Sequence, residues 1–181
     1  MKKTNTSEII NIATELFREK GYNASSISDI AEKAGLQKSS IYSHFNGKED
    51  ILLQAVNTLS EQFRQNVLSI AYDKNFTPHQ RLKKIIDIIE EIYFVKKGCV
   101  LGNLSLEISN TIPKVREAIH EFFVEWAKDL AFILKEEYGN AKAKAMGEDI
   151  VIRIEGAIMW MRISNDTSVF KRTCREIRSL C

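Results

Sequence analysis

Apolar residues recur every three to four positions along nearly the whole chain, which is the spacing of one face of an α-helix. A period-two alternation of apolar and polar residues, which would indicate strands, is not convincing anywhere. The two prolines, Pro78 and Pro113, each stand where a helix can begin. The pattern therefore predicts an all-α fold of about nine helices, with three in an N-terminal part and six in a C-terminal part.

The expected helices are separated by polar or glycine-containing breaks. We expect a boundary between residues 47 and 48, which gives an N-terminal domain over 1–47 and a C-terminal domain over 48–181. The lysines and glycine at 96–98 have the composition of a helix end. The helices expected in the C-terminal part cover residues 48 to about 71, 78–96, 101 to about 110, 113 to about 137, about 141–164 and about 167–181. The expected connectors are residues 72–77, 138–140 and 165–166.

The most specific pattern lies in residues 26–48. Ser26 with Asp29 three positions later has the spacing of a capping box, so a helix is expected to begin there. Gly35 supplies the backbone freedom of a sharp turn, and residues 38–45 fit a second helix. Two short helices joined by a glycine turn predict a helix-turn-helix, a motif that places one helix in the DNA major groove.

The outward face of that second helix carries chemistry that suits DNA. Ile41 and Phe45, four positions apart, are expected to face the core. Phosphates need cations and hydrogen-bond donors, and base edges need short polar groups. Between Gln37 and Lys48 there is no acidic residue, although charged residues make up 28% of the chain. The field expected there is positive, whereas the net charge of +2 for the whole chain does not by itself indicate nucleic acid.

The segment from Ile9 to Leu52 resembles the N-terminal domain of the TetR family of bacterial transcriptional regulators. The resemblance rests on Ala13, Leu16, Phe17, Gly21, Tyr22, Ile30, Ala31, Ala34, Gly35, Ile41, Tyr42, Phe45, Lys48 and Glu49. It implies that residues 38–44 form the recognition helix and that Tyr42, Lys48 and Ser26 contact phosphates. A helix N-terminus such as that after Ser26 is also an anion site on physical grounds. The expected DNA-binding residues are Ser26, Gln37, Lys38, Ser39, Ser40, Tyr42, Ser43, His44 and Lys48.

The resemblance also implies a homodimer that packs two C-terminal helices of each subunit into a four-helix bundle. Two recognition helices must reach successive major grooves, roughly 34 Å apart, on a near-palindromic operator. Gly156 would allow close approach of two helices. The alternative, that the same apolar stripe covers the core of the monomer, stays open at this point. The residues expected at the dimer interface are Ile154, Ala157, Ile158, Met161, Phe170 and Ile177.

A sensor domain needs a cavity, and the candidate lining is largely aromatic. The resemblance places an inducer site among the middle helices, and aromatic walls favour a small hydrophobic or planar effector. The alternative interpretation is ordinary core packing. His120 is a further candidate polar anchor, beside Asn103 and Glu107. The expected ligand-binding residues are Tyr93, Phe94, Cys99, Asn103, Leu104, Glu107, Phe122, Phe123, Trp126 and Trp160.

Residues 98–104, read GCVLGNL, resemble a segment that recurs in one subset of TetR-type regulators. Cys99 follows two lysines and precedes an expected helix start, and both features stabilise a thiolate. Covalent modification of Cys99 by an electrophile is therefore an alternative trigger, and a buried, inert cysteine is the plainer interpretation. A hydrolase-like site of Cys99 and His120 lacks an orienting partner and an oxyanion motif. A helix-turn-helix protein that organises DNA without a ligand is a third possibility.

Composition narrows the remaining classes. Three widely spaced cysteines, Cys99, Cys174 and Cys181, argue against a disulfide framework and fit a reducing cytoplasm. The N-terminal residues lack the apolar core of a signal peptide, and no stretch approaches the ~20 apolar residues of a membrane span. No metal-ligand spacing or phosphate-binding glycine loop is present. We expect a cytoplasmic regulator without enzymatic activity, cofactor or metal, whose partners are double-stranded DNA, a small-molecule effector and a second copy of the chain.

Overall fold

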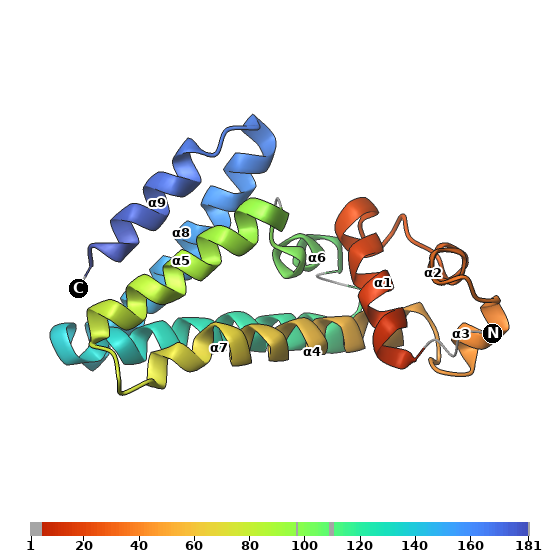
Figure 1. The fold of residues 1–181 in the computed structure, drawn as a ribbon, viewed down its shortest axis with the longest axis horizontal. Coiled ribbons are helices and arrows are strands. Elements are labelled where there is room, and N and C mark those ends of the chain that lie inside the picture. The colour runs from red at the N-terminus through yellow and green to blue at the C-terminus, as the bar shows by residue number, and fades with distance from the viewer. Residues whose placement is uncertain (1–4, 97, 109–110, 181) are drawn as a thin grey trace. The chain divides into compact units, whose positions relative to one another are not determined.

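The computed structural model describes residues 5–96, 98–108 and 111–180. These parts of the chain contain nine α-helices, one short 3-10 helix and no strand (Figure 1). The prediction of an all-α fold with nine helices is confirmed. None of the helices described is both long enough and apolar enough to cross a bilayer.

The helices follow one another with short connections. In chain order they are α1 (Thr6–Lys20), α2 (Ile27–Ala34), α3 (Lys38–Tyr42), α4 (Lys48–Asn66), the 3-10 helix η1 (Leu68–Tyr72), α5 (Pro78–Lys96), α6 (Val100–Ile108), α7 (Pro113–Tyr138), α8 (Asn140–Ser164) and α9 (Ser168–Arg178).

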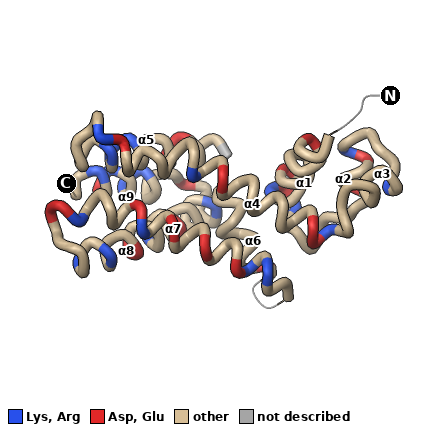
Figure 2. The backbone as a smooth tube through the Cα atoms, turned by 90° about the horizontal axis from the view of Figure 1, so that it is seen from below, with Lys and Arg blue, Asp and Glu red and all other residues tan. Residues whose placement is uncertain are grey.

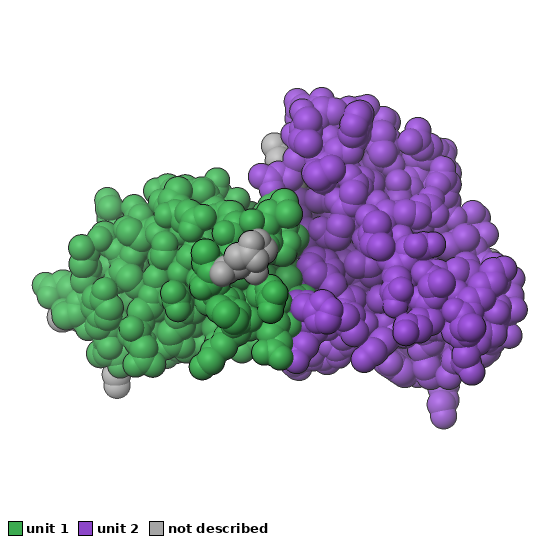
Figure 3. Space-filling view, turned by 180° about the vertical axis from the view of Figure 1, so that it is seen from behind, with its two compact units in different colours: residues 1–60, 100–119 green, residues 61–99, 120–181 purple. Residues whose placement is uncertain are grey.

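The chain divides into two compact units, which Figure 3 shows in different colours. Unit 1 comprises residues 1–60 and 100–119, and unit 2 comprises residues 61–99 and 120–181. Helices α1, α2, α3 and α6 belong wholly to unit 1, and α6 packs on α1. Helices α4 and α7 contribute residues to both units. This grouping follows packing, and the functional boundary expected between residues 47 and 48 stays a prediction.

Unit 1 is built on the buried face of α1. Ile9, Ala13 and Phe17 recur at helical spacing and are almost completely buried. The helix begins where the side chain of Asn5 accepts a hydrogen bond from the backbone N–H of Glu8. Helix α2 packs on α1, and α3 packs on α2.

Unit 2 has α5 and α9 packed together, with α8 also against α9 and η1 against α5. Helix α5 carries Leu82, Ile85, Ile86 and Ile89, all fully buried. These four residues are spaced i, i+3, i+4 and i+7 and share one face of α5. The opposite face carries exposed charged residues, namely Lys83, Lys84, Asp87 and Glu91. The sequence pattern suggests a central helix, but α5 buries one face only.

The helix expected to run from residue 48 to about 71 ends earlier than the prediction. Helix α4 stops at Asn66, and Val67 has φ −122° and ψ −60°, outside the α-helical region. The 3-10 helix η1 follows and buries Leu68 and Ala71. A 3-10 turn has three residues per turn, so these two residues, three apart, point to the same side. Apolar spacing alone does not distinguish this turn from a continuing α-helix.

Most other helix ends lie within two or three residues of the expected positions. Helix α3 ends at Tyr42 rather than at Phe45, although Phe45 still donates its N–H to Ile41 O at 3.0 Å. Tyr138 belongs to α7 instead of a connector, and α9 ends at Arg178. Lys97, residues 109 and 110 at the end of the expected sixth helix, and Cys181 lie outside the described residues.

Candidate nucleic-acid interface

The start of α2 is fixed by Ser26 and Asp29, as the capping-box spacing predicts. The Ser26 hydroxyl accepts a hydrogen bond from Asp29 N–H at 3.2 Å, and the Asp29 carboxylate accepts from Ser26 N–H at 2.7 Å. Hydrogen bonds from the Ser26 hydroxyl and then from its backbone N–H lower the pKa of Asp29. A carboxylate therefore already occupies the N-terminus of α2, and a phosphate would have to share that position with Asp29.

The turn between α2 and α3 has the geometry expected from its glycine. Gly35 adopts φ 65° and ψ 32°, the left-handed conformation, and Leu36 N–H closes the turn on Ala31 O at 2.9 Å. After the turn, Ile41 is fully buried and Phe45 is 2% exposed. The predicted inward face of α3 is confirmed, and the opposite face is free to contact another molecule.

The outward face of α3 is polar and lacks acidic residues. Tyr42 is 58% exposed although it is a large aromatic residue. Lys38 is the one charged residue of α3, and Figure 2 shows no acidic segment on that helix. Of the expected DNA-binding residues, Ser26, Gln37, Lys38, Ser39, Tyr42, Ser43 and His44 are exposed, and Ser40 and Lys48 are half-buried.

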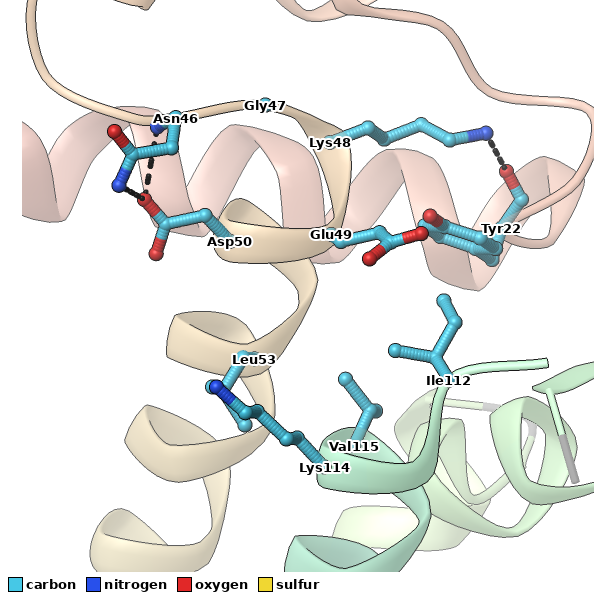
Figure 4. Close-up of a pocket in the computed structure, with 10 residues that line it drawn as sticks. All are labelled: Tyr22, Asn46, Gly47, Lys48, Glu49, Asp50, Leu53, Ile112, Lys114 and Val115. Atoms are coloured by element: carbon cyan, nitrogen blue, oxygen red, sulfur yellow. Dashed lines mark hydrogen bonds between the residues drawn. The ribbon is translucent and has the colours of Figure 1, made fainter.

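Lys48 is engaged within unit 1. Its ammonium donates to Tyr22 O at 3.0 Å and to Ser25 O at 2.8 Å, and it lies 4.1 Å from the centre of the Tyr22 ring. Figure 4 shows the extended Lys48 side chain reaching the backbone of Tyr22. A direct phosphate contact by Lys48 would have to share or replace these bonds, so the contact implied by the resemblance stays a prediction.

A cleft of about 620 Å³ lies in unit 1 between the start of α4 and the start of α7 (Figure 4). Leu53, Ile112 and Val115 form its apolar wall, and Glu49 and Lys114 bring charges of opposite sign. The pKa of Tyr22, at its edge, is raised by burial and then by the Glu49 carboxylate. Lys48 also lines the cleft, so the cleft lies beside the end of the helix-turn-helix segment, residues 26–48.

Glu107, which the sequence interpretation assigns to an effector site, bonds the loop between α1 and α2 in unit 1. Its carboxylate accepts the backbone N–H of Asn23 at 3.0 Å. The sequence does not indicate this contact, because helical spacing places Glu107 on a face of α6 without indicating which helix packs there. Asn103 and Leu104 also belong to unit 1, and Leu104 is buried.

Three of the expected ligand-binding aromatic residues do come together in unit 2. Trp126 is fully buried, and its ring centre lies 6.1 Å from that of Phe122 and 6.3 Å from that of Phe123. Phe63 completes the cluster at 5.1 Å from Trp126 and 5.2 Å from Phe122. The Nε1–H of Trp126 is buried without a hydrogen-bond partner. Phe63, on α4, is not among the expected ligand-binding residues, because the sequence interpretation treats α4 only as the link between the two parts of the chain.

A second cluster joins the buried Tyr93 and Cys99 with the half-buried Glu155. The Tyr93 hydroxyl donates to Cys99 Sγ at 3.6 Å, and the Cys99 thiol hydrogen-bonds the Glu155 carboxyl. Burial raises the pKa of Glu155 to about 7, and the Cys99 hydrogen bond opposes that shift. Glu155 Oε1 is buried without a hydrogen-bond partner. The sequence does contain a sign of this position. Glu155 lies four residues after Val151 and three before Ile158, so it shares a face of α8 with these two buried residues.

Two expected ligand-binding residues lie at the surface of unit 2 instead. Phe94 is 48% exposed, with the ammonium of Lys171 5.1 Å from its ring centre, and Trp160 is 53% exposed. Helix α5, which carries Phe94, and helix α8, which carries Trp160, have apolar residues on more than one side. Apolar spacing therefore does not show which of these residues point inward. His120 is exposed, while Cys99 is 3% exposed and lies beside a carboxyl group. This is not the arrangement of a cysteine activated by a histidine base.

The residues expected at the dimer interface are all buried inside the single chain. Burial in the monomer contradicts the assignment, because a side chain enclosed by its own subunit has no surface to offer a partner. Helix α8 is apolar on two sides, and the helical period alone cannot tell the core side from the outer side. The residues concerned are Ile154, Ala157, Ile158, Met161, Phe170 and Ile177.

The fold and the exposed helix-turn-helix define the class of DNA-binding regulatory proteins. Residues 9–55 match the family described as bacterial regulatory proteins, tetR family. Residues 79–176 match the family described as transcriptional regulator LmrA/YxaF-like, C-terminal domain. The chain belongs to the TetR family of transcriptional regulators.

Known relatives agree over most of the chain. The transcriptional regulator LmrA of Bacillus subtilis is 30% identical over 160 residues, which cover 84% of this chain and 83% of that protein. The transcriptional repressor DhaR of a Mycobacterium strain is 27% identical, over 87% of this chain and 82% of that protein. A TetR regulator from Legionella pneumophila has a crystal structure with a TM-score of 0.87 and 25% identity, over 98% of this chain and 97% of that chain. These relatives are regulators rather than enzymes, which confirms the non-enzymatic interpretation.

Proposed function

We propose that the chain is a homodimeric, effector-responsive transcriptional repressor that binds a near-palindromic operator in the cytoplasm. The observation that carries the proposal is the outward face of α3, where an exposed Tyr42 and Lys38 lie on an acid-free helix anchored by Ile41. Such a face offers donors to phosphates and short polar groups to base edges. The name of DhaR, a repressor, supports repression.

The proposed effector site lies in unit 2 around the aromatic cluster of Phe63, Phe122, Phe123 and Trp126. A buried N–H without a partner costs about 1–3 kcal/mol, so the indole of Trp126 favours an effector that carries a hydrogen-bond acceptor. The aromatic walls favour an apolar or planar body, in agreement with the sequence-based expectation.

Reversible binding is the proposed trigger rather than covalent modification of Cys99. The thiol is 3% exposed and lies next to the Glu155 carboxyl, whereas reactive cysteines are accessible and have cationic surroundings. A quinone that released DNA from the wild type and not from Cys99→Ser would favour the covalent alternative. Cys174 serves as the inert reference thiol, because burial and then the Glu90 carboxylate raise its pKa to about 12.

The proposed dimer uses the outer face of α8 instead of the residues first expected. Ile152, Met159, Trp160 and Ile163 are all more than half exposed and recur at helical spacing. Gly156 lies between them, and a Cβ there would meet nothing within 4 Å. A stripe of exposed apolar residues that includes a small residue suits close helix–helix packing.

The repressor mechanism needs a difference in effector affinity between two states. The effector must bind the form in which the two recognition helices miss their grooves more tightly than the DNA-bound form. A coupling of ~1–3 kcal/mol is typical and corresponds to roughly 5- to 150-fold in affinity. The helix-turn-helix protein that organises DNA without a ligand would show no such release.

The test is a gel-shift titration with the DNA upstream of the chain's own gene. The wild type is expected to bind one segment specifically, with affinity that falls steeply as salt rises. Tyr42→Phe removes only the hydroxyl of an exposed side chain, so affinity should fall by about 3- to 10-fold while the dimer and the melting temperature stay unchanged. Tyr72→Phe is the control for DNA binding: Tyr72, on η1 in unit 2, is 51% exposed and its hydroxyl donates to Asp129, so its loss should lower the melting temperature and leave operator affinity intact. Equal binding to all sequences would contradict the operator, and loss of the dimer in Tyr42→Phe would contradict the placement of Tyr42.

A further inference from the structure

The loop between α1 and α2, residues 21–25, is held by two charged side chains from other helices of unit 1. Lys48, the first residue of α4, donates to the carbonyls of Tyr22 and Ser25. Glu107 of α6 accepts the N–H of Asn23 at 3.0 Å. A cation thus binds the carbonyl groups of the loop and an anion binds its N–H group, each with the sign that the backbone dipole favours.

The loop's own bonds leave that N–H available for Glu107. Ser25 N–H closes a turn on Tyr22 O at 3.1 Å, and the Ser25 hydroxyl donates to Gly21 O at 2.7 Å. Asn23 is the second residue of this four-residue turn, a position whose N–H points outward in a β-turn. Glu107 therefore satisfies a group that the turn itself does not use.

Gly21 lets the carboxylate approach this closely. Its φ is 83°, and a Cβ added there would lie 2.5 Å from Glu107 Oε1 and 3.0 Å from Oε2. A side chain at this position would push the carboxylate away from the loop. Gly21 thus serves both the end of α1, where its N–H bonds Phe17 O at 3.0 Å, and the seat of Glu107.

The loop leads directly into the DNA-binding surface. Ser26, the N-cap of α2, follows Ser25 without an intervening residue, and α2 packs on the recognition helix α3. The position of Ser25 therefore sets where α2 begins. Any displacement of the loop is passed on to the N-terminus of α2 and to the helix that it supports.

We propose that Glu107 is a positioning residue for DNA binding: its hydrogen bond to Asn23 N–H, opposite Lys48, fixes the α1–α2 loop and with it the start of α2. Glu107 acts through the loop and does not contact DNA. The proposal rests on the DNA-binding function proposed above. It makes α6 part of the DNA-binding apparatus although its sequence contains no DNA-binding motif.

The sign of the expected effect separates this role from general electrostatics. Removing a negative charge from a DNA-binding protein should strengthen binding to the polyanion. The loss of the Glu107 bond should instead weaken it, because the loop is no longer fixed. Glu107→Gln removes the same charge but keeps an oxygen that accepts the Asn23 N–H, so it should bind DNA as well as the wild type or better.

The experiment measures operator affinity by fluorescence anisotropy with the full-length chain and its upstream operator DNA. Glu107→Ala is expected to weaken binding by ~10-fold, as for the loss of one hydrogen bond to a charged group. Asn23→Pro removes the donor instead, and proline is favoured at the second position of a turn. Both variants should lose the same factor, and the double variant should lose no more than either one.

The controls distinguish failure of this proposal from failure of the proposed function. Glu117→Ala, an exposed carboxylate of α7 in unit 1, should leave affinity unchanged or slightly raised. Three outcomes would overturn the role of Glu107: Glu107→Ala binds as tightly as the wild type or more tightly, Glu107→Gln binds as weakly as Glu107→Ala, or the losses add in the double variant. In each case Tyr42→Phe would still report on operator binding, so the proposed function would stand. If the wild type itself bound no operator, both proposals would fall. Should Glu107→Ala fail to fold, the comparison of Asn23→Pro with Glu107→Gln decides between the same outcomes.

Discussion

At the scale of single residues, unit 2 buries polar atoms whose partners are missing. Glu155 Oε1 and Trp126 Nε1 are buried without hydrogen bonds, and each costs folding free energy that an apolar side chain would not. Such groups are uncommon in native structures, and a strongly raised carboxyl pKa such as that of Glu155 is found most often at functional sites. Glu155 lies on α8 and Trp126 on α7, so the cost falls in the part of the chain to which we assign effector binding.

Glu155→Gln should stabilise the chain relative to the wild type, and by more at neutral pH than in mild acid. Burial raises the pKa of Glu155 from 4.5 to about 7, so the folded state prefers the protonated form. The contribution of Glu155 to the stability is therefore fully present below pH ~4.5, and it is lost as pH rises towards 7, because the unfolded chain ionises first. The loss approaches ~3 kcal/mol at about 1.4 kcal/mol per pKa unit, and glutamine avoids it.

Thermal unfolding followed by circular dichroism between pH 5 and pH 8.5 measures this difference at one fixed protein concentration. Glu148→Gln, an exposed position on the same helix, is the control and should show a difference that does not change with pH. A pH-independent offset in Glu155→Gln would show that the carboxyl is not buried in solution.

The residue pattern predicted the local geometry of residues 26–45 well and the packing of the C-terminal helices poorly. Ser26 with Asp29, and Gly35 with Ile41, are set by contacts within a few positions, so spacing reveals them. Glu107 bonds a loop 84 positions earlier in the chain, and its partner cannot be deduced from neighbours in sequence. Long-range partners depend on which faces of helices meet.

At the scale of elements, α8 shows how one helix uses two glycines in opposite ways. Gly147 is buried, and a Cβ there would overlap Ala127 O and lie 3.1 Å from Ala131 N on α7. Gly156 is exposed, and a Cβ there would have open space. Helix propensity disfavours both glycines by the same amount, so packing alone distinguishes the two positions.

Gly147→Ala should destabilise the chain by about 1–3 kcal/mol, because the added methyl forces α8 away from the backbone of α7. This exceeds the gain of ~1 kcal/mol that alanine brings inside a helix. Gly156→Ala, the matched control, adds a Cβ that meets nothing within 4 Å of its own chain, so in the monomeric Ile163→Asp background, where the proposed dimer does not contribute, it should stabilise by up to ~1 kcal/mol. Urea unfolding at fixed protein concentration checks both values, and equal effects at the two positions would refute the close contact of α8 with α7.

Helix positions could be predicted from the sequence because apolar spacing and capping residues mark them locally. The limits of α5, α7 and α8 lie within one residue of expectation, and the main error is at Val67, where the backbone leaves the α-helix without glycine or proline. The inward face was not predictable where two faces are apolar. On α8 the core takes Ile154 and Ile158, and Trp160 and Ile163 remain outside.

At the scale of the whole molecule, the exposed stripe of α8 is the surface that we propose for the dimer. Ile163 is 76% exposed, Ile152 67%, Met159 55% and Trp160 53%, a concentration of apolar surface on one helix that a monomer in water would not favour. The exposed residues of α9 are instead mostly charged, among them Lys171, Arg172 and Arg175. The stripe on α8 is thus the part of the chain best suited to form the centre of a two-fold interface, with the charges of α9 towards its rim.

Ile163→Asp should convert the proposed dimer to a monomer, since it places a charge at the centre of an apolar interface. Val95→Asp, at a position 68% exposed on α5, introduces the same charge elsewhere and should leave the dimer intact. Sedimentation equilibrium measures the mass of each variant. The monomer should also bind operator at least ~100-fold more weakly, because it can occupy only one half-site and loses the effective concentration of the second recognition helix. A dimer that survives Ile163→Asp would assign subunit contact to another surface, and a monomer that still binds the operator at full affinity would remove the two-fold arrangement from the mechanism.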